Sequence, residues 1–140
     1  MTSLHYPSLE LCKKLTEAGF PRTEMYIGEY RHTQLNKEFE VTIRDSCYEW
    51  DYETFRNVWF CPSVMELLDE MPNWITIKYK DWDVWNYKLE IGRQWTSESI
   101  EAYYVHYVEW NWAYAFYLNT LPNALSEMWL WLKENNYLTK

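Results

Sequence analysis

The sequence predicts an α+β fold, with a mostly antiparallel sheet of about five to seven strands and three short helices on one face. Apolar residues recur at helical spacing in three segments, each beside a proline, and alternate with polar residues in the segments between them. Most links between successive strands are too short for the crossovers that parallel strands need. Because 140 residues suit one core, we expect a single α+β domain over residues 1–140.

The first two helices have clear start and stop signals. Residues 8–18 begin at the N-cap Ser8 and end before Gly19, which can take the left-handed conformation that follows a helix. Residues 63–71 follow Pro62, and Ser63 with Glu66 three residues later forms a capping box.

The third helix is expected over residues 122–135. It starts near Pro122, and Asn135 or Asn136 can provide its left-handed exit. The apolar faces of the helices and strands predict a core made of Leu11, Leu15, Phe20, Leu67, Leu68, Ile75, Ile77, Leu125, Trp129 and Leu132.

Two hairpins are predicted in the second half of the chain. Residues 74–80 and 84–91 alternate apolar and polar side chains on either side of a polar turn. Residues 103–108 and 112–118 are aromatic or β-branched on both faces and predict a second hairpin, with an aromatic helix as the alternative. Upstream, residues 25–31 and 38–44 form another candidate pair, and residues 56–61 a further short strand.

Several chemistries are excluded or disfavoured. Glycine occurs only at positions 19, 28 and 92, so neither a P-loop nor a dinucleotide-binding fingerprint can be written. The three cysteines have no CxxC spacing, and we expect Cys12 and Cys61 to be buried in a reducing cytosol. His106 is expected to be a buried or half-buried histidine, and Asp81-Trp82-Asp83 a hairpin turn. We expect no cofactor and no metal.

The charge of the chain limits its partners. Thirteen basic against twenty-one acidic residues give a net charge of -8, which disfavours direct binding to nucleic acid. No apolar run is long enough for a membrane helix, and the charged first twenty residues do not form a signal peptide, so we expect a cytoplasmic protein without membrane contact.

Aromatic residues are unusually frequent, with 10 Trp, 13 Tyr and 5 Phe. The core cannot hold all of them, and exposed aromatic patches usually mark binding surfaces. The segment from Asp45 to Phe55 combines four acids and four aromatics with no base. We therefore predict a partner-binding surface with Trp50 as its anchor, facing a protein with a basic surface. Its residues are Tyr48, Glu49, Trp50, Asp51, Tyr52 and Glu53.

Three segments resemble small uncharacterised proteins of bacteriophages and prophages. They are residues 7–21 (PSLELCKKLTEAGFP), 61–68 (CPSVMELL) and 121–132 (LPNALSEMWLWL). The resembling features are a Gly-Phe-Pro turn after the first helix, a Pro-Ser helix start and a final Ala-Leu-x-x-x-Trp-Leu helix. The resemblance implies an accessory protein in the cytoplasm of an infected bacterium, and it implies no activity or site residue.

These observations favour a non-enzymatic phage or prophage protein that binds and inhibits a host protein, such as a defence factor. The first alternative is a module that binds or sequesters a nucleotide-like small ligand, with an aromatic ring on the base and cations on the phosphate. Its candidate residues are Lys78, Lys80, Trp82, Lys88 and Arg93. The second alternative is an enzyme whose carboxylate or Cys-His site has no recognisable motif.

Overall fold

The computed structural model describes residues 5–21, 23–30, 40–45, 55–80, 82–95, 101–108 and 112–138. In this part of the chain three helices and seven strands follow one another. In chain order they are α1 (Leu9–Glu17), β1 (Met25–Tyr30), β2 (Glu40–Asp45), β3 (Phe55–Phe60), α2 (Val64–Asp69), β4 (Trp74–Lys80), β5 (Asp83–Trp95), β6 (Glu101–Val108), β7 (Trp112–Leu118) and α3 (Leu121–Glu134).

The α+β class is confirmed, and each strand pairing in the described residues is antiparallel. The strands form two sheets rather than one, in the orders β2-β1-β3 and β4-β5-β6-β7. The sheets separate because α2 follows β3 and packs on α3, which interrupts the ladder before β4 begins. Residues 103–108 and 112–118 form a hairpin, as predicted, and not an aromatic helix.

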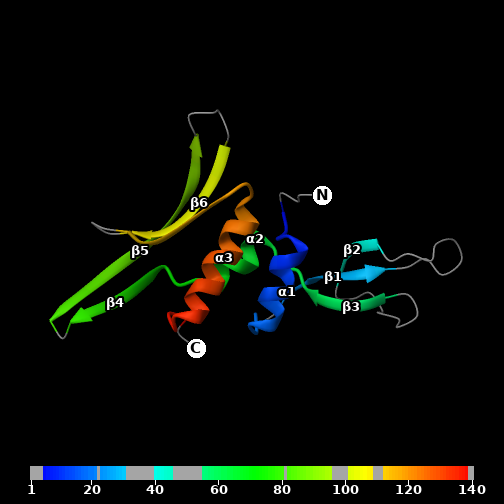
Figure 1. The fold of residues 1–140 in the computed structure, drawn as a ribbon, viewed down its shortest axis with the longest axis horizontal. Helices are drawn as coiled ribbons and strands as arrows, with labels where there is room; N and C mark the ends of the chain where they lie inside the picture. Colours follow the sequence, from blue (N-terminus) through cyan, green and yellow to red (C-terminus); the bar gives the residue numbers. More distant parts are fainter. Residues whose placement is uncertain are drawn as a thin grey trace, which may run out of the picture.

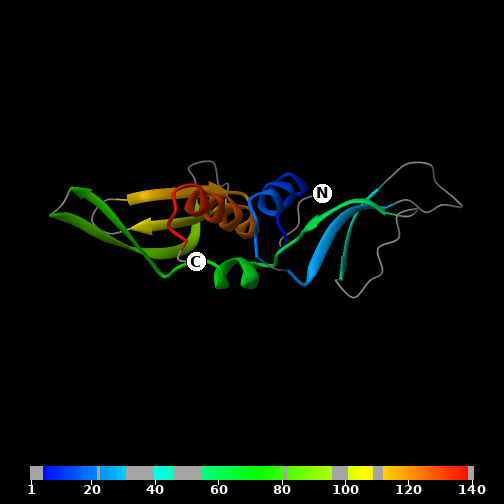
Figure 2. The ribbon, with the colours of Figure 1, turned by 90° about the horizontal axis from the view of Figure 1, so that it is seen from below.

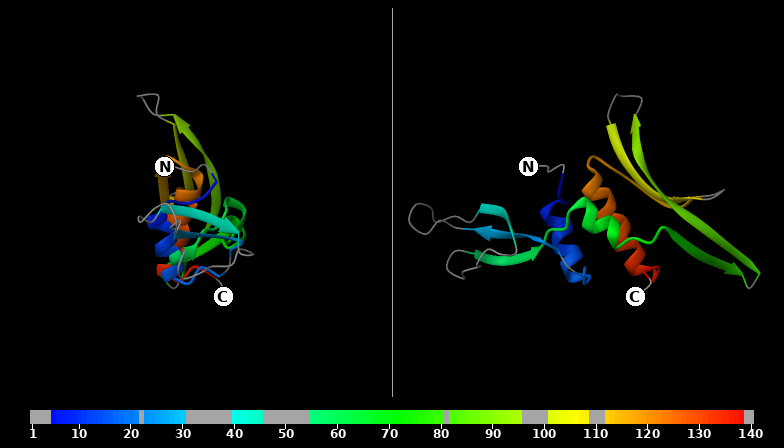
Figure 3. Two further views of the ribbon diagram at one scale, coloured as in Figure 1. Left: turned by 90° about the vertical axis from the view of Figure 1, so that its right-hand side faces the viewer. Right: turned by 180° about the vertical axis from the view of Figure 1, so that it is seen from behind.

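The helices lie between the two sheets instead of on one face of a single sheet. Figure 1 shows them in the middle of an elongated molecule, with β1–β3 on one side and β4–β7 on the other. α1 packs against β3, and α3 packs against β6, β7 and the other two helices. In Figure 2, seen from below, α3 runs beside β6 and β7. Figure 3 shows from behind that the β4–β5 turn and the far end of the β5–β6 pair project in different directions.

The predicted helix ends are confirmed to within about two residues. Ser8 Oγ accepts a hydrogen bond from the Leu11 amide, and Gly19 takes the left-handed conformation with φ +84°. The Phe20 amide then donates to the Leu15 carbonyl at 2.9 Å. α3 ends in the same way, with Asn136 at φ 62° in place of glycine.

Glu66 connects the start of α2 with the chain that leads into β1. The predicted capping box is present, because Ser63 Oγ accepts from the Glu66 amide at 3.2 Å and Glu66 Oε1 accepts from the Ser63 amide at 3.0 Å. The second oxygen, Oε2, accepts from the Glu24 amide at 2.9 Å, and Thr23 Oγ1 donates to Oε1 at 3.4 Å. One carboxylate thus fixes both the helix start and a segment about forty residues away.

The core prediction is confirmed, since eight of the ten expected residues are buried. Leu68 and Ile77 are partly buried and pack against the same cluster. This main cluster joins all three helices to the larger sheet. A smaller cluster of Cys12, Ile27 and Cys61 joins α1 to the smaller sheet, so both described cysteines are buried as expected.

The central strand β5 changes partners along its length. Its residues Asp83 to Lys88 pair with β4, and its residues Lys88 to Trp95 pair with β6. Lys88 therefore has a partner on both sides, Trp74 and Val108. The first half of β5 with β4 forms a hairpin that projects from the helices, while the second half lies in the sheet that α3 covers (Figure 1).

Replacing Tyr107 with Phe tests how the larger sheet is held to the end of α2. The buried Tyr107 hydroxyl donates to the Pro72 carbonyl at 2.6 Å, and burial raises the pKa of this tyrosine above its ordinary value of 10. At pH 7 we expect Tyr107→Phe to lower the free energy of unfolding by about 1 kcal/mol.

Above pH 10 this difference between the two proteins should shrink. The unfolded phenol then ionises while the folded one stays neutral, so the unfolded state binds fewer protons and the wild-type protein loses stability as pH rises. Urea denaturation of both proteins at pH 7 and above pH 10 measures the effect. A difference that is the same at both pH values would contradict it.

Candidate functional site

The β4–β5 hairpin exposes several large apolar side chains. Trp82 in its turn is 79% exposed, and Trp74 and Tyr79 on β4 are 56% and 54% exposed. Val84 on β5 is also exposed. By the register, Trp74 and Val84 lie on one face of the hairpin and Tyr79 on the other, with Trp82 in the turn, and exposed apolar side chains of this kind are typical of binding surfaces. We call Trp74, Tyr79, Trp82 and Val84 the hairpin surface.

The hairpin is anchored at one end and exposed at the other. Ile75 and Tyr87 are paired across the strands and buried in the main core, while residues 78–80 of β4 are exposed. Towards the turn the predicted alternation of buried and exposed residues is lost, because the hairpin extends beyond the helices that cover its base (Figure 1). The turn therefore presents both of its faces to solvent.

Cross-strand hydrogen bonds support this hairpin. The Tyr79 and Tyr87 hydroxyl oxygens lie 2.7 Å apart and share a hydrogen bond, and the Thr76 hydroxyl donates to Asn86 Oδ1 at 2.7 Å. At the turn, Lys80 Nζ lies 5.6 Å from the centre of the Trp82 ring, in a cation–π contact. These contacts join the two strands and involve two of the exposed aromatic side chains, Tyr79 and Trp82.

The structure brings only some of the predicted small-ligand residues together. Lys80 and Trp82 are in contact, and Lys78 is on the same strand as Lys80. Lys88 pairs with Trp74, which is four residues before Lys78 on β4. Lys88 is therefore about 13 Å from Lys78 along the hairpin. Arg93 is five residues further along β5, on the opposite face from Lys88. Four cations and one aromatic ring that are spread in this way do not surround one phosphate.

The predicted partner-binding segment lies outside the described residues. Tyr48, Glu49, Trp50, Asp51, Tyr52 and Glu53 all fall within residues 46–54. The structure describes the strands on either side of them, which are β2 and β3, and both pair with β1. The prediction for residues 48–53 therefore stays a prediction.

His106 is buried, as expected, in a polar and aromatic cluster on the larger sheet. Its Nε2 lies 3.0 Å from Glu90 Oε2 on the neighbouring strand, and its ring stacks on Tyr104 with centroids 4.8 Å apart. Tyr104 in turn covers Gly92, where an added Cβ would collide with the tyrosine ring. The cluster explains why glycine stands at position 92 and how a sheet tolerates an imidazole.

The two described cysteines have the properties of structural residues. Cys12 and Cys61 are fully buried, and a hydrogen bond with Cys12 together with burial raises the pKa of the Cys61 thiol. A protonated, inaccessible thiol is a poor nucleophile. His106 belongs to the other sheet, so the described residues do not pair it with these thiols.

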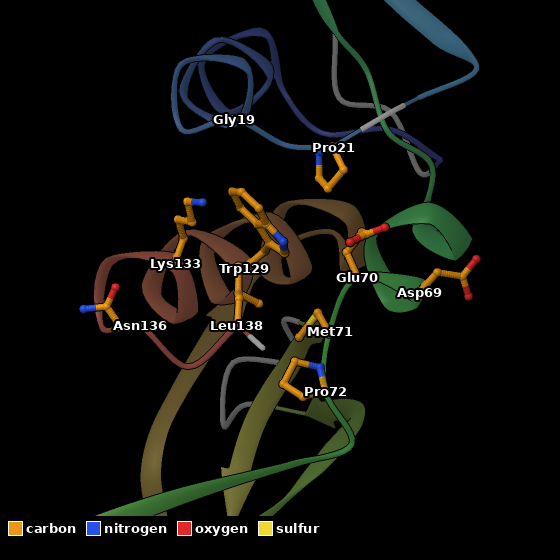
Figure 4. A pocket seen from close by; sticks show the side chains of 10 residues that line it. All are labelled: Gly19, Pro21, Asp69, Glu70, Met71, Pro72, Trp129, Lys133, Asn136 and Leu138. Atoms are coloured by element: carbon orange, nitrogen blue, oxygen red, sulfur yellow. The ribbon is translucent and has the colours of Figure 1, made fainter. Parts of the chain in front are cut away.

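A pocket of about 260 Å³ opens where the three helices end. Gly19 and Pro21 follow α1, residues 69–72 end α2, and Trp129, Lys133, Asn136 and Leu138 belong to α3 and its exit. In Figure 4 the indole nitrogen of Trp129 is on the edge of the ring that faces Glu70, whereas Asp69 and Asn136 point away from the centre. The apolar stripe of α3 correctly predicts that Trp129 lies in the core, but it does not show that this residue also lines a pocket.

Within the described ranges, no three His, Cys, Asp or Glu side chains gather as a metal site would require. No helix in that same part of the chain is long and apolar enough to cross a membrane. Comparisons with models of protein families, with curated proteins and with solved structures found no match. The function is therefore inferred from the surfaces themselves.

Proposed function

We propose that this chain is a non-enzymatic binding protein, an accessory protein of a phage or prophage that docks on a host protein and inhibits it. The observation that carries the proposal is the hairpin surface, where Trp74, Tyr79 and Trp82 are each more than half exposed. Aromatic side chains bury large areas at a small cost in rotamer entropy, and Trp and Tyr are enriched among residues that dominate binding energy.

The charge of the chain supports a protein as the partner. A net charge of -8 repels a phosphate backbone, while it attracts a protein with a basic surface and speeds their encounter. In this proposal Trp82 inserts into an apolar pocket of the partner. The predicted acidic segment 48–53 is a second, separate candidate for contacts with a basic protein, because the strands that flank it lie on the other side of the helices from the hairpin (Figure 1).

The hydrogen bonds within the hairpin favour tight docking. Because the Tyr79–Tyr87 and Thr76–Asn86 contacts already order the two strands, little conformational entropy is lost when a partner binds. An inhibitor benefits from such a rigid element, since it can occupy a groove or an active-site cleft of its target without rearranging first.

Photo-crosslinking from single positions tests the proposal. A photoreactive phenylalanine analogue at Trp82 is expected to crosslink one host protein from bacterial lysate, and the same analogue at Met65 is expected to crosslink none. Met65 is the matched control because it is 65% exposed but lies on α2, away from the hairpin. The captured protein is then purified, and its own activity is measured with and without this chain.

Affinity for that partner provides the quantitative measurement. Trp82→Ala is expected to weaken binding about tenfold, the loss typical of a buried aromatic anchor, while Met65→Ala leaves it unchanged. Equal crosslinking from positions 82 and 65, or full affinity in a Trp74→Ala, Trp82→Ala double variant, would overturn docking through the hairpin. An unaffected partner activity would overturn inhibition alone.

A further inference from the structure

The larger sheet ends on one side in a strand that carries no charge. β7 is the last strand in the order β4-β5-β6-β7, so within the described residues only one of its two edges is paired. Its sequence, WAYAFYL, is aromatic or aliphatic throughout and contains neither proline nor glycine. In Figure 2, β7 is the orange strand at the rim of the sheet, beyond β6. The backbone N–H and C=O groups of such an edge can pair with another strand.

The other three strands at the edges of the two sheets carry charged residues. They are β2, β3 and β4, and their charged residues are Glu40, Arg44 and Asp45, then Arg56, then Lys78 and Lys80. Charged side chains at a sheet edge keep it from pairing with the edge of another chain. β7 lacks this protection, and a short uncharged run rich in aromatic residues pairs readily with a second strand. In the described part of the chain, β7 is therefore the edge that is open to an added strand.

The apolar layer under α3 continues to β7 and is incompletely covered there. Val105 on β6 is fully buried, while Phe116, its partner in the register, is only partly buried although it packs against the same cluster. On the other face of β7, Tyr117 is 42% exposed. A strand added beyond β7 would cover these side chains in the way that β7 covers those of β6.

The sequence of β7 is complementary to itself. Its regular part is residues 114–118, because the register with β6 shifts near the start of β7. When two such strands run antiparallel about Phe116, Ala115 of each lies opposite Tyr117 of the other, so that a small residue meets a large one on the same face. No charged residue faces another, which matters because each chain has a net charge of -8.

We propose that β7 pairs antiparallel with β7 of a second copy of this chain, about a two-fold axis at Phe116. The two larger sheets then form one continuous sheet, with α3 of both copies on the same face. A two-fold axis closes such an assembly at two chains. The hairpin surface belongs to the opposite edge of the sheet, so this inference goes beyond the proposed function and does not depend on it.

Sedimentation equilibrium of the full chain measures the association. We expect a monomer–dimer equilibrium with a dissociation constant of about 10 μM, since a contact through one pair of strands is small. The dimer should become more stable from about 50 to about 500 mM NaCl, because salt screens the repulsion between two acidic chains. A dimer held by pairs of opposite charge would instead weaken as salt is added, and this result would overturn the proposal.

A lysine on the edge strand tests whether β7 makes the contact. Tyr117→Lys places a charge in the proposed interface and is expected to weaken the dimer about tenfold or more. Val41→Lys is the matched control, because Val41 is also an exposed residue of an edge strand but belongs to β2 in the smaller sheet. It should leave the dissociation constant unchanged. Circular dichroism checks that both variants are folded.

Disulfide crosslinking tests the register, and it decides the matter if Tyr117→Lys does not fold. In a background with Cys47→Ser, the Ala115→Cys and Tyr117→Cys proteins are incubated with oxidised glutathione, separately and mixed. Residues directly opposite each other in an antiparallel pair have Cα atoms about 5 Å apart, within the range of a disulfide, whereas the two copies of position 115 are about 8 Å apart. We therefore expect crosslinked dimers in the mixture and few in either protein alone.

Three further results would overturn the inference. One is a chain that stays monomeric at about 100 μM, ten times the expected dissociation constant. Another is a dimer that a folded Tyr117→Lys variant leaves intact. The third is crosslinking that is as strong in each cysteine protein alone as in the mixture, since antiparallel pairing about Phe116 does not allow it.

Discussion

Replacing Leu15 or Leu132 with Ala is expected to lower the free energy of unfolding by about 2–5 kcal/mol. Leu15 on α1 and Leu132 on α3 are both fully buried in the main cluster, which joins the three helices to the larger sheet. Truncation removes the transfer free energy of three carbon atoms and leaves a cavity that the surrounding helices can close only in part. Chemical denaturation followed by tryptophan fluorescence measures the loss.

Met65→Ala is the matched control for these truncations. Met65 is also a large apolar residue on a helix, but it is 65% exposed, so its loss should change stability by less than about 0.5 kcal/mol. If both leucine variants also lose less than about 0.5 kcal/mol, the helix faces described here are wrongly assigned.

Replacing Glu66 with Ala should cost about 2–3 kcal/mol, although the residue is only partly buried. The substitution leaves the Ser63 and Glu24 amides without their acceptor and removes a longer contact of the Thr23 hydroxyl, which keeps the Met25 carbonyl as its acceptor at 2.9 Å. An ordinary capping residue satisfies one end of one helix. Glu66 in addition holds the segment between α1 and β1, so its loss loosens both places.

Two further variants separate these contributions. Ser63→Ala removes one hydrogen bond of the capping box and should cost about 1 kcal/mol, because the contacts of Glu66 to residues 23 and 24 remain. Glu66→Gln keeps one acceptor oxygen and should lie between wild type and Glu66→Ala. Equal losses in Ser63→Ala and Glu66→Ala would show that the long-range contacts contribute nothing.

Local signals predicted the helices and the hairpins because those elements are decided within a few residues. Ser63 with Glu66 and Gly19 with Phe20 are capping patterns whose hydrogen bonds span at most five residues. The division of the strands into two sheets, in contrast, is not decided by residues close together in the sequence. It depends on α2 packing against α3, across about sixty residues, and no local pattern reports that contact.

The candidate sites show the same limit. The hairpin around Trp82 was recognisable from alternation, and the exposure of Trp74, Tyr79 and Trp82 agrees with the expectation that the core does not hold every aromatic residue. The pocket was not recognisable, because Trp129 fits the apolar stripe of α3 and a stripe does not report which way an indole nitrogen faces. Pro21, Glu70 and Lys133 come together only through the packing of three helix ends.

The change of partners at Lys88 divides the larger sheet into two regions that need not open together. In the described residues, the part of β5 nearest the turn is paired with β4 alone, and its free energy of opening is set by a few cross-strand contacts. The part just beyond Lys88 is paired with β6, which packs on α3, and only the far end of this pair projects from the helices (Figure 3). A partner that binds the turn therefore stabilises first the part of the hairpin before Lys88, and its effect on the rest of the sheet passes through the pairings of Lys88.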